Sequence, residues 1–221
     1  MTKKIELYAP AKINLFLHII GQRDDGYHQL QSAFQLIDWY DTVSLELIEA
    51  DEIVRPVGAD EVNAENALVV RAARLLKKYA SYPYGVKIHL EKNIPMGAGL
   101  GGGSSDAASV LIGLNHLWGL GLRQSQLAHL GLQLGADIPF FLFGQNAFVE
   151  GIGEQLKRLD LPEEQFLVIF PGQSVATKDV FRDDTLTRNH APITISDFLA
   201  SSWKDPKFGN DLQPVASKIC P

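Results

Sequence analysis

The amino-acid sequence predicts a protein of mixed α and β structure, of the α/β or α+β class. Residues near the N-terminus alternate between apolar and polar with the period of a β-strand, whereas later apolar segments have the length and spacing of helices. A glycine-rich loop joins a strand-like segment to one of these helices. Apolar residues make up 46% of the 221 positions, which is enough for a core in one or two domains.

The first strands are expected at residues 5–8 and 11–20. In the second of them, alternation divides eight side chains between two faces, with Ile13, Leu15, Leu17 and Ile19 on one face and Lys12, Asn14, Phe16 and His18 on the other. A lysine on a strand most often protects a sheet edge. Lys12 and Asn14 therefore indicate no function by themselves.

A turn and further regular elements follow. Residues 21–26, GQRDDG, have the composition of a turn, and Tyr27 and His28 directly after it fit a surface loop. Later in the chain we expect strands at residues 28–41, 42–48, 86–91, 147–150 and 166–170, and helices that start near residues 66, 104, 125 and 177.

Cap residues mark the ends of three of these helices. Asn66 is expected at the N-cap of its helix, and Thr177 at the N-cap of a short helix that carries Phe181. Gly135 is expected to close the helix of residues 125–134 in the C′ position. On its own, Phe181 fits a core residue.

The stretch PMGAGLGGGSSDAAS, residues 95–109, is the most unusual in the chain. Five of the seven residues 97–103 are glycine. Because glycine loses more backbone entropy on folding than any other residue, such a cluster indicates positive φ angles or a backbone pressed against a ligand. Ser104, Ser105 and Asp106 are expected to cap the apolar helix that follows. The N-terminus of a helix attracts phosphate, so we predict a bound nucleotide triphosphate.

Other phosphate-binding and linker interpretations of the loop fit less well. Three of its glycines satisfy G-x-G-x-x-G after a strand, but residues 107–136 contain no acidic residue to bind the ribose of a dinucleotide. The Walker motif needs a lysine where Gly103 stands. A flexible linker would be polar throughout, whereas this loop leads into an apolar helix.

Charge and cysteine content exclude several classes of partner and compartment. The net charge of -6 and the lack of a lysine or arginine run argue against nucleic acid, so a small-molecule ligand is expected. The lone cysteine, Cys220, cannot form an intramolecular disulfide, and a cytoplasmic location is expected. Lys12 and Asn14 interrupt the apolar N-terminal run, which therefore fits neither a signal peptide nor a membrane span.

Asp137 directly precedes the apolar run IPFFLF, in which Pro139 is expected to hold Ile138 extended. A carboxylate at the start of such a run is partly desolvated unless it is paired, which makes Asp137 a candidate general base. A turn aspartate that caps local amides explains the same residue equally well.

The chain resembles the GHMP small-molecule kinases in three places, namely PAKINL at residues 10–15, PMGAGLGGGSSDAAS at residues 95–109 and LGADIPFF at residues 134–141. The longer run of residues 10–38 is similar to the branch that uses ATP to phosphorylate the 2-hydroxyl of a cytidine-diphosphate derivative of methylerythritol, in the non-mevalonate route to isoprenoids. Mevalonate kinases and galactokinases are expected to show an acidic G-E-H motif where this chain reads GQRDDGYH. The resemblance extends to about Asp211.

The resemblance implies two domains. An ATP-binding domain of the ribosomal protein S5 domain 2 type is expected over residues 1–155, and a ferredoxin-like substrate-side domain over residues 156–221. The family's third glycine-rich segment is lacking, so the second domain is expected to be incomplete and the chain truncated. A kinase for homoserine or mevalonate, or a nucleotide-binding fragment with impaired catalysis, are the alternatives.

The resemblance also implies the nucleotide site. The ATP phosphates are expected to contact Pro95, Met96, Gly97, Ala98, Gly99, Leu100, Gly101, Gly102, Gly103, Ser104 and Ser105. Lys92 and Asn66 are expected near the nucleotide. The hydroxyl of Ser104 or Ser105 is expected to hold Mg²⁺ together with phosphate oxygens, without a metal cage made of protein alone.

The catalytic and substrate-binding residues follow from the same resemblance. Asp137 is expected to accept the proton of the substrate hydroxyl, with Lys12 beside it to support the developing charge. Such a lysine would also offset the desolvation of a buried carboxylate and keep it ionised. The cytidine end is expected to meet an aromatic stack and polar groups, which map to Asn14, Tyr27, His28, Thr177 and Phe181.

Overall fold

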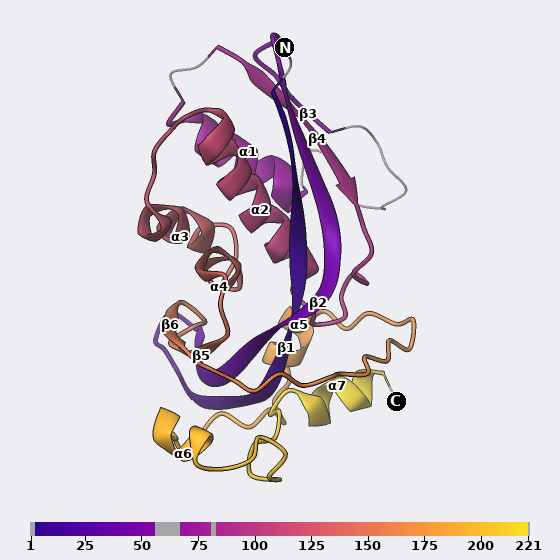
Figure 1. Cartoon of the computed structure of the whole chain (residues 1–221). Helices are drawn as coiled ribbons and strands as arrows, with labels where there is room; N and C mark the ends of the chain where they lie inside the picture. The colour runs from indigo at the N-terminus through magenta and orange to yellow at the C-terminus, as the bar shows by residue number, and fades with distance from the viewer. Residues whose placement is uncertain (1–2, 56–66, 81–82, 221) are drawn as a thin grey trace. The chain divides into compact units, whose positions relative to one another are not determined.

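The computed structural model describes residues 3–55, 67–80 and 83–220 (Figure 1). The chain forms two compact units. The first unit consists of residues 1–11, 38–94 and 101–144, and the second unit of residues 12–37, 95–100 and 145–221. This division does not test the expected domain boundary after residue 155, which stays a prediction.

Two long strands supply both units. Strand β1 (Lys4–Gln22) pairs with strand β2 (His28–Ile48), and each runs from one unit into the other. The sequence predicted strands over these residues but divided each of them in two. Local alternation weakens at a proline or a charged residue, whereas the pairing of strands continues through such positions.

The first unit is a sheet covered by helices on one face. The C-terminal part of β2 pairs antiparallel with β4 (Gly85–Glu91), and β3 (Ile53–Val54) pairs parallel with β4. Helices α1 (Leu68–Lys77) and α2 (Gly102–Leu117) pack against each other on this face (Figure 1). At Gly113 a Cβ atom would overlap the side chain of Leu45, so the glycine allows α2 to approach β2 closely.

Helices α3 (Gln124–Leu132) and α4 (Ile138–Phe143) complete the first unit. Helix α3 ends before Gly135, which does not adopt the expected left-handed cap; Gln133 stands at the C-cap instead. The expectation of an extended Ile138 is also wrong. Pro139 occupies the first turn of α4, where its missing N–H leaves no helical hydrogen bond unmade.

The second unit combines a small sheet with short helices. The N-terminal part of β2 pairs antiparallel with β5 (Ala147–Glu150), which pairs with β6 (Gln155–Arg158). The helices are α5 (Thr177–Arg182), α6 (Ile195–Leu199) and α7 (Gln213–Ile219). The ring centroid of Phe16 lies 5.3 Å from that of Phe198 and 5.6 Å from that of Phe208, so aromatic rings build the core of this unit.

The strand expected at residues 166–170 does not form. Phe166 packs against the aromatic core, but Leu167 is 88% exposed and Ile169 is 80% exposed. No described residue forms a β-ladder with this segment. Its alternating sequence suits a strand, yet a strand also needs a neighbour to accept its backbone hydrogen bonds.

Two of the expected helix caps are wrong as well. Ala67 stands at the N-cap of α1, and the expected Asn66 lies outside the described residues. Ala176 stands at the N-cap of α5, so Thr177 is the first helical residue. Both alanines have an extended backbone, and the helical hydrogen bonds start directly after them. No helix in the described ranges is long and apolar enough to cross a bilayer.

Candidate active site

Three glycines of the expected phosphate loop have a left-handed backbone. The φ angle is +69° at Gly97, +74° at Gly99 and +72° at Gly101. Residues with a Cβ atom rarely adopt this conformation. The inference that the glycine cluster serves positive φ angles is therefore confirmed.

Helix α2 begins within the glycines and not at the serines. Gly101 is its N-cap and Gly102 its first residue, so residues 104–106 lie inside the helix and their expected capping role is wrong. A Cβ atom at Gly102 would lie 3.1 Å from Ile94 Cγ2 and 3.2 Å from Asp41 Oδ2. Both distances are shorter than most Cβ contacts, so a side chain at this position would require Ile94 or Asp41 to shift.

The two serines differ in their surroundings. Ser104 is half-buried, and a Cβ atom on Gly135 would come within 3.9 Å of its Oγ. Ser105 is fully buried, and its Oγ has no hydrogen-bond partner within the described part of the chain. The same described residues contain no group of three His, Cys, Asp or Glu that could hold a metal ion. A role for either hydroxyl toward Mg²⁺ stays a prediction.

Residues 95–100 belong to the second unit, where backbone contacts hold them. The N–H of Lys12 donates to the carbonyl of Leu100 at 2.9 Å, and the N–H of Val175 donates to the carbonyl of Gly97 at 3.3 Å. A Cβ atom on Gly97 would overlap the Cβ atom of Ser174. This part of the loop is thus fixed in position by its own unit.

Lys92 joins two buried carboxylates in the first unit. Its Nζ donates to Asp41 Oδ2 and, at 2.8 Å, to Asp106 Oδ2. Asp41 is 0% exposed and Asp106 is 1% exposed. The other oxygen of Asp41 accepts the N–H groups of Asn93 at 2.6 Å and Ile94 at 2.8 Å. The cluster of Asp41, Lys92 and Asp106 therefore ties the end of β4 to the beginning of α2.

One ammonium group between two carboxylates leaves the cluster short of positive charge. Burial raises the pKa of Asp106 to about 7, although Lys92 opposes this rise. Burial alone would lower the pKa of Lys92, but the Asp106 and Asp41 carboxylates raise it above its ordinary value. The two amides bound to Asp41 stabilise its negative charge. Asp106 is therefore the member of the cluster that takes up a proton near neutral pH.

Lys12 and Asn14 lie side by side on β1, as the sequence predicted. Lys12 is 5% exposed, and its Nζ donates to Asn14 Oδ1 at 2.6 Å and lies 4.5 Å from the ring centroid of Phe34. Asn14 Nδ2 in turn donates to Ser32 Oγ at 3.1 Å. A lysine that protects a sheet edge would be solvated, so its burial excludes that interpretation.

Asp137 is the N-cap residue of α4 and is half-buried. Its side chain makes no capping hydrogen bond to that helix. Both interpretations of Asp137, as a general base and as a turn aspartate, stay predictions. Asp137 lies in the first unit and Lys12 in the second, so each is described within its own unit. Their expected pairing stays a prediction.

The second unit brings His28 and Phe181 together. Their rings stack with centroids 5.0 Å apart and planes 26° from parallel. Tyr27, next to His28, is 59% exposed, and Thr177 opens the helix that carries Phe181. Arg188 Nε donates to His28 Nε2 at 3.0 Å, a contact that no sequence pattern predicted.

Similarity to known proteins decides the family. The sequence model of the GHMP kinases N terminal domain matches residues 67–145. A 4-diphosphocytidyl-2-C-methyl-D-erythritol kinase of Polynucleobacter asymbioticus is 58% identical over 219 residues, which cover 99% of this chain and 74% of that protein. The chain belongs to this kinase family. A relative of the same name from Aromatoleum aromaticum is 50% identical and is covered over 76% of its length.

Solved structures agree with membership of the 4-diphosphocytidyl-2-C-methyl-D-erythritol kinase family. A crystal structure of a 4-(cytidine 5'-diphospho)-2C-methyl-D-erythritol kinase is 36% identical with a TM-score of 0.80, over 98% of this chain and 79% of that one. A homoserine kinase of Cytophaga hutchinsonii is 20% identical with a TM-score of 0.58, and the match covers 89% of this chain and 63% of that one. That kinase shares the fold. The predicted GHMP kinase fold and kinase class are confirmed.

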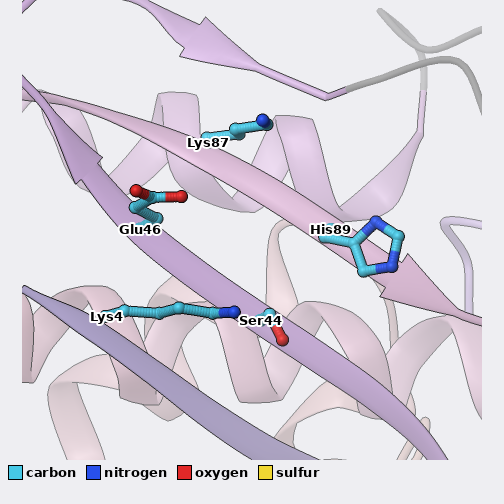
Figure 2. A pocket seen from close by; sticks show the side chains of 5 residues that line it. All are labelled: Lys4, Ser44, Glu46, Lys87 and His89. Atoms are coloured by element: carbon cyan, nitrogen blue, oxygen red, sulfur yellow. The ribbon is translucent and has the colours of Figure 1, made fainter.

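A pocket of about 240 Å³ in the first unit is lined by none of the expected site residues (Figure 2). Its lining side chains project from the sheet of the first unit and alternate with the buried residues of β2 and β4; they are Lys4, Ser44, Glu46, Lys87 and His89. Glu46 faces Lys87 across the two strands, so opposite charges line the hollow.

Proposed function

We propose that this chain transfers the γ-phosphoryl group of ATP to the 2-hydroxyl of 4-diphosphocytidyl-2-C-methyl-D-erythritol, a step of the methylerythritol phosphate route to isoprenoid precursors. One observation carries the proposal: relatives at 50–58% identity over nearly the whole chain bear the name of this kinase. The left-handed glycines and the start of α2 within the glycine run support a site for the ATP phosphates.

The nucleotide would bind along residues 95–105. In this proposal, the amides of the first turn of α2 donate to phosphate oxygens, and Ser104 contributes its half-buried hydroxyl to Mg²⁺. The metal would neutralise charge on the phosphate oxygens during transfer. Lys92 supports this site through Asp41 and Asp106 rather than as a free cation, since its ammonium already binds both carboxylates.

Asp137 would act as the general base. Its carboxylate accepts the proton of the 2-hydroxyl, the hydroxyl oxygen forms a bond to the γ-phosphorus, and the bond from that phosphorus to the bridging oxygen of ADP breaks. Lys12 would stabilise the negative charge on the attacking oxygen. Its orientation by Asn14 Oδ1 and its burial support such a role, because a buried cation acts more strongly than a solvated one.

The cytidine end would lie against the stack of His28 and Phe181. Aromatic faces suit a pyrimidine ring, and the exposed Tyr27 offers a further face close to His28 in the chain. Thr177 and Asn14 would supply polar contacts.

The test is a reaction of the purified protein with ATP, Mg²⁺ and the cytidyl substrate, followed by ³¹P NMR and by ADP release. We expect phosphorylation of the cytidyl substrate, and of neither homoserine nor mevalonate. Asp137→Asn should lower kcat by at least about a hundredfold with little change in ATP affinity, whereas the exposed Asp184→Asn should have normal activity.

Three results would contradict these assignments. Phosphorylation of homoserine or mevalonate alone would change the substrate. Thermal stabilisation by ATP without any ADP release would indicate a binding protein without turnover. Near-normal kcat in Asp137→Asn would remove this carboxylate from the mechanism.

A further inference from the structure

Arg188 clamps His28 to the end of helix α5. Its Nε donates to His28 Nε2 at 3.0 Å. The remaining N–H groups of the guanidinium donate to main-chain carbonyls: Nη1 to Leu186 at 3.2 Å, and Nη2 to Phe181 at 3.1 Å and Asp183 at 2.9 Å. Because the backbone fixes the guanidinium on this side, its Nε–H direction toward His28 is fixed as well.

This contact determines where the proton of His28 lies. A guanidinium group has donors and no acceptor, so His28 Nε2 must accept through its lone pair. A neutral imidazole carries a single proton, which must then be on Nδ1. Within the described part of the chain, His28 Nδ1 makes no hydrogen bond to protein, so its N–H is open to a ligand.

The charge of the ring is determined by the same neighbour. Burial lowers the pKa of His28 from its ordinary value, and the positive charge of Arg188 lowers it further. The nearby Asp183 carboxylate accepts both the N–H of Thr185 at 2.7 Å and the Thr185 hydroxyl. A protonated His28 would point its Nε2–H at the Nε–H of Arg188, and two donors cannot bond to each other. The His28 ring therefore stays neutral at physiological pH.

We propose that Arg188 is a positioning residue for the pyrimidine: it holds His28 as a neutral ring protonated on Nδ1, which donates a hydrogen bond to an acceptor on the cytosine edge. The inference rests on the proposed function, since the ligand is the cytidine ring of the substrate. Cytosine offers acceptors at O2 and N3, whereas N3 of uracil is itself a donor. A donor on Nδ1 that meets N3 therefore favours cytosine over uracil.

The direct test is an imidazole spectrum. Long-range ¹H–¹⁵N correlation on the free protein with labelled histidine distinguishes the two neutral tautomers and gives the pKa of each ring. We expect wild-type His28 to carry its proton on Nδ1 and to titrate below an ordinary histidine. Arg188→Met should shift His28 toward the tautomer protonated on Nε2 and raise its pKa. The exposed Arg182→Met, at the end of α5, should change neither.

Kinetics give a second readout that a purely structural role would not produce. In Arg188→Met, KM for the cytidyl substrate should rise about tenfold near pH 8, while KM for ATP stays unchanged. Acidification should reverse part of this rise in KM, because a protonated His28 again has an N–H on Nδ1. Wild type should show no such recovery.

Two outcomes would overturn the proposal. One is a wild-type His28 protonated on Nε2, a measurement that needs no variant and therefore holds even where Arg188→Met fails to fold. The other is an unchanged tautomer in Arg188→Met. A protein that does not phosphorylate the cytidyl substrate would refute the proposed function separately, since the spectra are recorded without ligand.

Discussion

Replacing Asp106 by Asn should change how the stability of the protein depends on pH. Asp106 is almost completely buried, and one of its oxygens, Oδ1, has no hydrogen-bond partner within the described residues. Burial raises its pKa from 3.8 to about 7. A raised pKa means that the folded state binds a proton that the unfolded state has already lost. The stabilisation is therefore complete below pH 3.8 and is lost as the pH rises through about 7.

The magnitude follows from the same two values. The difference between 3.8 and about 7, at about 1.4 kcal/mol per pH unit, corresponds to roughly 4 kcal/mol between pH 4 and pH 8. An asparagine side chain keeps the shape and the acceptor for Lys92 but cannot ionise. The free energy of unfolding of Asp106→Asn, relative to wild type, should therefore increase up to about pH 7 and level off above it.

Urea unfolding followed by circular dichroism at pH 5, 6, 7 and 8 measures this difference, because all other titrating groups are shared by the two proteins. The exposed Asp160→Asn is the matched control and should run parallel to wild type, since its side chain is 81% exposed. A constant difference between Asp106→Asn and wild type across the four pH values would refute the reasoning. It would show that Lys92 compensates the burial of this carboxylate completely.

Two further predictions concern the loop and its support. Gly97→Ala should weaken ATP binding at least about tenfold in calorimetry. The new Cβ atom would overlap Ser174, and the φ angle of +69° strains a residue with a Cβ atom by about 1–3 kcal/mol. Gly119→Ala, with a similar φ angle of +64° and no atom within 4 Å of its Cβ, is the control and should leave ATP affinity unchanged. Lys92→Met should lower the free energy of unfolding at pH 7 by about 3–5 kcal/mol, because it leaves two buried carboxylates without their cation. Adding Asp106→Asn to this variant should restore part of the lost stability. An unchanged urea midpoint with a raised KM for ATP would instead make Lys92 a direct nucleotide contact.

The sequence predicted those parts of the fold that local periodicity controls. The alternation of residues 11–20 and 42–48 corresponds to strand in the structure, and the glycine cluster does contain left-handed residues. Where the prediction depended on packing, it was wrong. Serines are better N-caps than glycine in isolation, yet the N-cap of α2 is Gly101, whose φ angle of +72° disfavours a residue with a Cβ atom.

The candidate site shows the same limit more sharply. The neighbouring Lys12 and Asn14 were visible as a pair because a strand places alternate residues on one face. Arg188 gave no signal, since it lies in an irregular segment 160 residues from His28. Asp41 lies 51 residues before Lys92, and in the sequence it resembles an ordinary polar residue within a strand. Contacts over such separations follow from tertiary packing and leave no local pattern.

The charges around α2 bear on the proposal that the backbone of this helix binds phosphate. With all three groups ionised, Asp41, Lys92 and Asp106 carry a net charge of minus one near the N-terminus of this helix, where it would repel a triphosphate. Protonation of Asp106 near neutral pH removes that charge and leaves Asp41 and Lys92 as a neutral pair. Because Lys92 is thus engaged, the proposed attraction for phosphate in the first unit relies on the amides of the first turn and the helix dipole. Gly102 and Gly103 add no side chains to this turn, so in the proposal the glycines and the buried cluster both serve phosphate binding.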